Sequence, residues 1–178
     1  HRDLHSFPTR RSSDLLQRFL LEYFPQGTGF AACAAPPLPS GLPRADVRAF
    51  SIDDAATTEI DDAFSLQALP GLGWRVGIHI AAPSLGIAPG SPLDAIARDR
   101  LSTVYLPGRK ITMLPENVVE GFTLCAGRDC AAISLYLTLT PEFEITACES
   151  RVEIVPVVAN LRHHDLEPLF NEGTIAAG

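Results

Sequence analysis

Five carboxylates fall within ten residues of an otherwise apolar stretch: Asp53, Asp54, Glu59, Asp61 and Asp62. Like charges held about 4 Å apart repel by roughly 4 kcal/mol at an effective dielectric constant near 20, so a fold that gathers them needs a cation between them. Oxygen donors at this density suit Mg²⁺ or Mn²⁺, whereas zinc prefers histidine and cysteine. The cluster predicts either a catalytic metal site or a solvated acidic loop, and the spacing alone favours neither.

The chemistry of such a metal site follows from its ligands. A Mg²⁺ ion held by few carboxylates keeps several waters and accepts phosphate oxygens, which makes phosphodiester hydrolysis its natural reaction. On a regular strand Glu59 and Asp61 share one face and Asp62 points away, so all three serve one centre only if the backbone bends there. A calcium loop of the EF-hand type is disfavoured because its glycine and terminal glutamate are missing.

The elements that must position these acids are mostly strands. Alternating apolar residues and turn signals predict strands over residues 47–52, 63–69, 74–81, 130–140 and 144–155. Apolar residues at helical spacing predict helices over 16–23, 93–104 and 115–119, and another from Leu166. Ser13 or Asp14 is the expected cap of the first helix and Asp165 of the last. Residues 31–43, rich in proline, read as an extended linker.

Composition limits the class of protein. The chain has 178 residues, 46% of them hydrophobic and 20% charged, which is typical of a globular domain. It has no run of about eighteen apolar residues, so we expect no membrane span. Four cysteines without a CxxC pair predict a reduced, cytoplasmic protein with free thiols. The formal net charge of −7 argues against a basic nucleic-acid-binding surface, but much of it comes from acids at the predicted metal site.

Several motifs in series carry a resemblance to a known family. The segment 51–64 resembles the first catalytic motif of the RNB family of exoribonucleases, the ribonuclease II and ribonuclease R type. The segments 77–81, 89–98, 102–108 and 113–115 follow in the family's order and at its kind of spacing. The resemblance covers about residues 46–172, which correspond to the first part of the family's catalytic domain.

The resemblance implies specific roles for residues of this chain. Asp53, Asp61 and Asp62 match the family's metal-binding and catalytic aspartates, and Glu59 stands where the family commonly has a fourth. The extra methylene of Glu59 moves its oxygens, and octahedral Mg²⁺ tolerates such a shift poorly. Tyr105 matches an aromatic residue that stacks on a nucleotide near the 3′ end, an interaction open to every base.

The remaining positions of interest are basic residues, a histidine, and one position where the sequence differs from the family's usual residue. Arg98, Arg100, Arg109 and Lys110 lie on or after the predicted helix and are candidates to meet RNA phosphates. The alternative for at least two of them is an ordinary surface arginine without a partner. His79 alternates with two isoleucines, and we expect a structural role for it rather than a catalytic one. Ala82 stands where the family often has an aspartate.

The implied fold is α+β, with a curved, largely antiparallel sheet and flanking helices. Residues 1–15 are expected to be a non-native or disordered tail, 16–45 a helix and linker, and 46–178 the truncated N-terminal portion of an RNB-like catalytic domain. The C-terminal half of that domain and an S1-like RNA-binding module are expected in a longer parent protein, and the fragment alone is expected to be inactive.

The implied activity is metal-dependent 3′→5′ hydrolysis of single-stranded RNA to nucleoside 5′-monophosphates, with Mg²⁺ or Mn²⁺ as cofactor. The alternatives are a non-catalytic RNA-binding or regulatory relative and, less favoured by Tyr105 and the motif order, a metal-dependent phosphatase.

Overall fold

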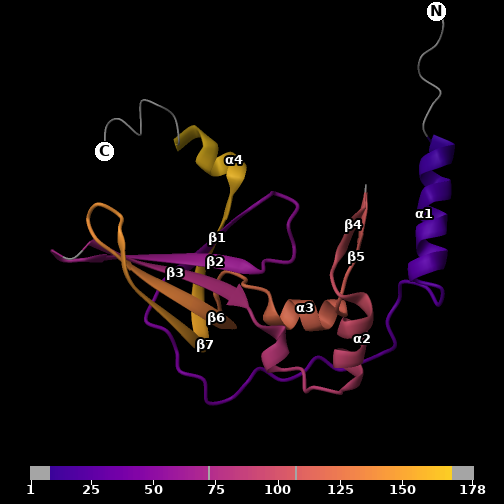
Figure 1. The fold of residues 1–178 in the computed structure, drawn as a ribbon, viewed down its shortest axis with the longest axis horizontal. Coiled ribbons are helices and arrows are strands. Elements are labelled where there is room, and N and C mark those ends of the chain that lie inside the picture. Colours follow the sequence, from indigo (N-terminus) through magenta and orange to yellow (C-terminus); the bar gives the residue numbers. More distant parts are fainter. Residues whose placement is uncertain (1–8, 72, 107, 170–178) are drawn as a thin grey trace, which may run out of the picture.

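Five strands form a closed barrel in the computed structural model, which describes residues 9–71, 73–106 and 108–169 (Figure 1). In barrel order they are β1 (Ala49–Asp53), β2 (Asp62–Leu69), β3 (Gly73–Ala81), β6 (Arg128–Leu139) and β7 (Ile145–Arg162). Neighbouring strands pair antiparallel except β1 and β7, whose parallel pairing closes the barrel. The predicted curved, largely antiparallel sheet is confirmed, and its closure removes the exposed edges of an open sheet.

The remaining elements lie outside the barrel. They are the helices α1 (Thr9–Tyr23), α2 (Pro92–Arg100), α3 (Glu116–Phe122) and α4 (His163–Leu166), the hairpin of β4 (Val104–Leu106) and β5 (Arg109–Ile111), and the short turns η1 (Pro83–Leu85) and η2 (Glu167–Leu169). In Figure 1, α2, α3 and the hairpin lie beside one end of the barrel, and α1 stands farther away. Within the described ranges, every helix is too short or too polar to cross a membrane.

The helix predicted over 93–104 extends four residues too far at its C-terminal end. Ser91 caps α2 by accepting a hydrogen bond from the Asp94 amide, and the helix ends at Arg100 because Leu101 takes a positive φ of 64°. Leu101, placed by the pattern on the buried side, is 79% exposed. Val104 instead pairs with Ile111 in the hairpin, so tertiary pairing overrides the helical periodicity.

Further predicted boundaries were wrong, and the helix predicted over 115–119 continues to Phe122. The first helix begins at Thr9, so neither Ser13 nor Asp14 caps it. The last begins at His163, and Asp165 lies within it. The final strand continues to Arg162 because β1 offers it a second partner beyond its hairpin with β6.

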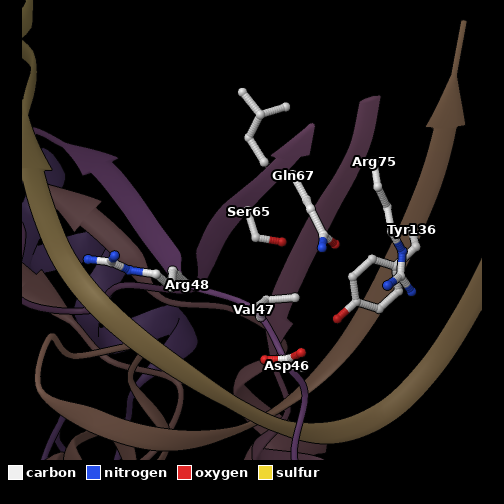
Figure 2. A pocket seen from close by; sticks show the side chains of 8 residues that line it. Asp46, Val47, Arg48, Ser65, Gln67, Arg75 and Tyr136 are labelled. Carbon is white, nitrogen blue, oxygen red and sulfur yellow. The ribbon is translucent and has the colours of Figure 1, made fainter. Parts of the chain in front are cut away.

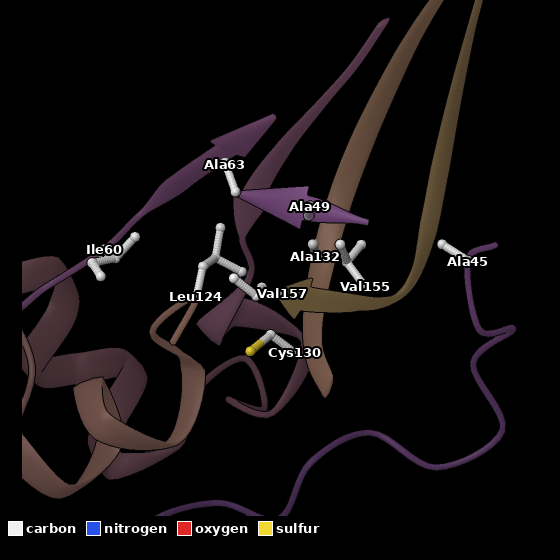
Figure 3. Close-up of a cluster of buried hydrophobic side chains, with 9 residues drawn as sticks. All are labelled: Ala45, Ala49, Ile60, Ala63, Leu124, Cys130, Ala132, Val155 and Val157. Carbon is white, nitrogen blue, oxygen red and sulfur yellow. The ribbon is translucent and has the colours of Figure 1, made fainter. Parts of the chain in front are cut away.

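A small hydrophobic core fills one end of the barrel, where the side chains in Figure 3 meet. Leu124, fully buried, enters this space from the segment after α3 and packs among alanines and valines of the strands. The small side chains of Ala49, Ala63 and Ala132 leave room for it. A second cluster outside the barrel packs Val118 and Phe122 of α3 over β6.

The other part of the barrel interior is polar. His79 is fully buried and its two ring nitrogens lie 2.8 Å and 2.9 Å from the hydroxyls of Ser134 and Ser65. Next to it the Tyr136 hydroxyl donates to Glu153 Oε1 at 2.6 Å. These contacts satisfy the buried groups and give His79 the structural position that its alternation predicts.

A cavity of about 220 Å³ opens from this polar interior, and Figure 2 shows its lining. Ser65 and Tyr136 form its inner wall, and the Arg75 guanidinium stacks 3.9 Å from the centre of the Tyr136 ring. Burial and the neighbouring Glu153 raise the pKa of Tyr136 to about 12, so the phenol stays a hydrogen-bond donor.

Candidate functional site

The acidic loop, residues 54–61, joins β1 to β2 and is fixed at both ends. Ile60 is buried, and its amide donates to the Thr123 hydroxyl at 2.8 Å. The Asp54 carbonyl accepts a hydrogen bond from Arg162 at 2.8 Å. An apolar anchor inside the acidic run thus holds the neighbouring carboxylates at the barrel rim.

Asp53 ends β1 and is oriented by residues far away in sequence. The Ser51 hydroxyl donates to Asp53 Oδ2 at 2.5 Å, and the Asn160 amide donates to the Ser51 oxygen at 2.9 Å. Asn160 also donates to the Leu124 carbonyl, which fixes its own orientation. Sequence reasoning missed Ser51 and Asn160, because no local pattern links residues 109 positions apart.

Glu59 is the most enclosed of the loop acids, with a side chain only 9% exposed. Lys110 Nζ lies 2.6 Å from Glu59 Oε1 and donates to the Thr58 hydroxyl at 2.9 Å. The Thr103 hydroxyl lies 3.5 Å from the other carboxylate oxygen, Oε2. The hairpin of β4 and β5 is therefore tied to the acidic loop through Glu59.

Asp61 and Asp62 are both exposed at the end of the loop, and the pKa of Asp61 is shifted. Partial burial raises the pKa of Asp61, as do the charges of Glu59, Asp62 and Asp53, and Lys110 offsets part of this effect. Asp62 is the first residue of β2 and pairs with Ile80 of β3. The side chains of Asp62 and Ile80 are both exposed. The regular strand starts at Asp62, so the required bend would have to lie at the end of the loop.

Three cavities adjoin the acidic loop, and one of them, of about 540 Å³, is lined by Thr58 and Glu59 of the loop, Lys110 and residues of α3. The inner cavity, of about 90 Å³, is lined by Glu59, Asp61 and Thr103 together with apolar side chains of α3 and its approach. The outer cavity, of about 470 Å³, brings residues of the loop opposite the hairpin. Its lining includes Asp54, Thr58, Glu59, Tyr105, Arg109 and Lys110.

The predicted RNA-binding residues separate into two groups. Tyr105, 72% exposed, lines the outer cavity with Arg109 and Lys110. Arg98 lies on α2 outside the linings of all three cavities, where it forms an exposed ion pair with Asp94 at 3.1 Å. The structure thus brings the hairpin residues to the acidic loop but leaves Arg98 elsewhere.

The donor chemistry and the arrangement of the acids disagree. Asp53, Glu59, Asp61 and Asp62 offer the hard oxygens that Mg²⁺ prefers. Nevertheless, across the described part of the chain no three acid, histidine or cysteine side chains are grouped closely enough to hold a metal ion. In this arrangement the acids do not form a complete metal site, and Lys110 is the cation in contact with Glu59.

Comparison with known families accounts for the barrel and the acidic loop together. The family model described as the RNB domain matches residues 44–176. The chain belongs to the RNB family. Two relatives in Arabidopsis thaliana, "DIS3-like exonuclease 2" and "Inactive exonuclease DIS3L2", are each 42% identical over 101 residues. That alignment covers 56% of this chain and 10% of each relative, so the chain spans about a tenth of their length.

A solved RNB-type structure has the same fold. Mycoplasma genitalium RNase R in complex with ribose-methylated single-stranded RNA superposes with a TM-score of 0.68 at 16% identity. The match covers 77% of this chain and 23% of that protein. At this identity the likeness supports the fold, and the RNB assignment rests on the sequence match.

Proposed function

We propose that this chain supplies the acidic loop and the RNA-facing hairpin of a cytoplasmic 3′→5′ exoribonuclease. Its substrate would be single-stranded RNA, its products nucleoside 5′-monophosphates and its cofactor Mg²⁺, with Mn²⁺ as a substitute. The observation that carries the proposal is the outer cavity, where Asp54 and Glu59 of the loop lie opposite Tyr105, Arg109 and Lys110. Membership of a family of exoribonucleases supports the same reaction.

The hairpin residues have distinct proposed tasks. Tyr105 presents an exposed ring on which a terminal base can stack, worth about 1–3 kcal/mol and independent of sequence. Arg109 adds a positive charge for a phosphate at the same cavity. Because Arg98 lies away from all three cavities, any contact it makes with RNA would be outside the site.

The 178-residue chain alone is proposed to be inactive. The described acids do not form a complete metal site, and the chain spans about a tenth of the relatives it matches. We propose that the rest of a catalytic domain completes the site and that an S1-like module adds RNA affinity.

The proposal is tested with 5′-labelled single-stranded RNA, comparing this chain with the complete product of its gene. We expect the complete product to shorten the RNA from its 3′ end only with Mg²⁺ or Mn²⁺. Asp62→Asn should lower the rate by at least about a hundredfold, because it removes one charged oxygen donor. Asp99→Asn, an exposed position on α2, is the control for lost charge. Unchanged decay with Asp62→Asn would contradict the assignment.

A second candidate, a non-catalytic RNA-binding relative, is favoured by the ion pair between Lys110 and Glu59. One of the two Arabidopsis relatives at 42% identity is named inactive. RNA binding by the complete product without metal-dependent decay would select this candidate. Activity gained with Glu59→Asp would attribute the loss to the longer side chain at this position.

A further inference from the structure

Lys110 forms an ion pair with Glu59, the acidic residue that lines both the outer and the inner cavity. Its ammonium lies 2.6 Å from Glu59 Oε1 and donates to the Thr58 hydroxyl at 2.9 Å. The Lys110 side chain is 34% exposed, whereas that of Glu59 is only 9% exposed. A charge pair enclosed on the carboxylate side is screened by water less than a fully exposed pair.

A divalent cation would compete for the same oxygen. Mg²⁺ binds carboxylate oxygens at about 2.0–2.1 Å, and an ammonium already at hydrogen-bond distance blocks that approach and repels the ion. The ammonium therefore occupies the position at Oε1 that a coordinating cation would need.

We infer that Lys110 is the resident cation of the acidic loop: it holds Glu59 away from metal coordination and thereby sets how tightly the loop binds divalent cations. This inference rests on the proposed function, which identifies the cation that competes with Lys110 for Glu59 as Mg²⁺ or Mn²⁺. It makes Lys110 a positioning residue that acts through Glu59, whereas the sequence predicts a contact between Lys110 and an RNA phosphate.

The test measures Mn²⁺ affinity directly, by the loss of the free-ion electron paramagnetic resonance signal on titration with the 178-residue chain. Lys110→Met keeps the apolar stem and removes the ammonium, and we expect it to lower the Kd for Mn²⁺ by about tenfold. Arg48→Met is the control, because it removes the same charge from an exposed residue that lines none of the cavities beside the acidic loop. It should change the Kd by less than about threefold.

A second pair of variants isolates Glu59. Glu59→Gln in the wild-type background should change Mn²⁺ affinity little, since Lys110 already occupies that carboxylate. The double variant Glu59→Gln with Lys110→Met should lose the gain seen with Lys110→Met alone. Lys110→Gln repeats the test if circular dichroism shows that Lys110→Met has not folded.

Several outcomes overturn the inference. Equal shifts with Lys110→Met and Arg48→Met would show that the effect comes from overall charge. The inference would also be wrong if Lys110→Met had the same Kd for Mn²⁺ as wild type, or if neither protein bound Mn²⁺ detectably. It would be wrong as well if the double variant with Glu59→Gln kept the higher affinity of Lys110→Met.

The RNA assay separates this inference from the proposed function. If the complete product degrades RNA with metal but Lys110→Met does not change the Kd for Mn²⁺, the exoribonuclease proposal holds and the inference about Lys110 is wrong. If Lys110→Met changes the Kd but the complete product degrades no RNA, the inference holds for a non-catalytic RNB protein.

Discussion

His79 is an ionisable group that the barrel keeps away from water. Burial lowers its pKa, and the charge of Glu153 opposes this effect only in part. Its partners are two serine hydroxyls, which satisfy a neutral imidazole without adding charge. A histidine buried in this way links protonation to unfolding.

We expect the free energy of unfolding to fall as pH drops below about 6.5, the ordinary histidine pKa, because the unfolded chain then binds a proton that the native state disfavours. His79→Gln should be less stable at neutral pH but should lose this component, whose slope is at most about 1.4 kcal/mol per pH unit. Urea unfolding between pH 5 and 8 measures both quantities. The exposed His163→Gln is the control, and an identical pH slope in wild type and His79→Gln would contradict the prediction.

At the scale of elements, β3, β6 and β7 carry apolar side chains on the outside of the barrel along one row of neighbouring positions, although Ala132, Val155 and Val157 of the same strands point into its core. Ile80 pairs with Ile133, which pairs with Val152, and these three side chains are 41–46% exposed. The inward positions on the same strands hold His79 and Ser134. The alternation of apolar and polar residues therefore predicts these strands correctly. It does not predict that Ile80, Ile133 and Val152 lie on the outside of the barrel while His79 and Ser134 lie inside.

Ile133→Thr tests this orientation. A β-branched residue is kept on an exposed strand position, so the free energy of unfolding should change by no more than about 0.5 kcal/mol while binding of the dye ANS falls. Ala132→Thr is the matched control, since it introduces the same side chain one residue away inside the packed barrel. It should cost about 1–3 kcal/mol. Equal destabilisation by the two changes would show that the faces are assigned wrongly.

At the scale of the whole molecule, stability depends on the closure of the barrel by β1 and β7. Their parallel register joins Ala49 to Val157 and continues to Asp53 opposite Arg162. By contrast, β1 meets β2 in the single register pair of Phe50 and Phe64. The end of β7 thus secures the strand that carries Asp53.

Truncation after Pro156 removes this pairing and should abolish cooperative unfolding, a loss comparable to the ~5 kcal/mol or more of an ordinary domain. Truncation after Arg162 keeps the β1–β7 pairs and should retain a cooperative transition. Thermal unfolding followed by circular dichroism compares the two chains. Cooperative unfolding of the shorter chain would refute the role given to closure.

Much of the fold and part of the site follow from the sequence. The acidic run and the five barrel strands are signalled by neighbours within a few positions, where charge density, alternation and turn chemistry act. Tyr105 is singled out only by the resemblance to the RNB family. The same local signals extended α2 wrongly to Val104, because an apolar residue at helical spacing can equally pair with Ile111 in a hairpin.

The positions of the charged side chains and of the five barrel strands can be predicted from the amino-acid sequence, since these properties depend on side-chain chemistry and local backbone preference. The partners follow from tertiary structure: Lys110 pairs with Glu59, Asn160 lies behind Ser51, and β7 closes on β1. Such contacts join segments tens of residues apart, and their geometry depends on strand register and barrel closure, which local periodicity does not encode. The acidic residues of the RNB motif can therefore be identified from the sequence, whereas the ion pair between Lys110 and Glu59 is found only in the folded structure.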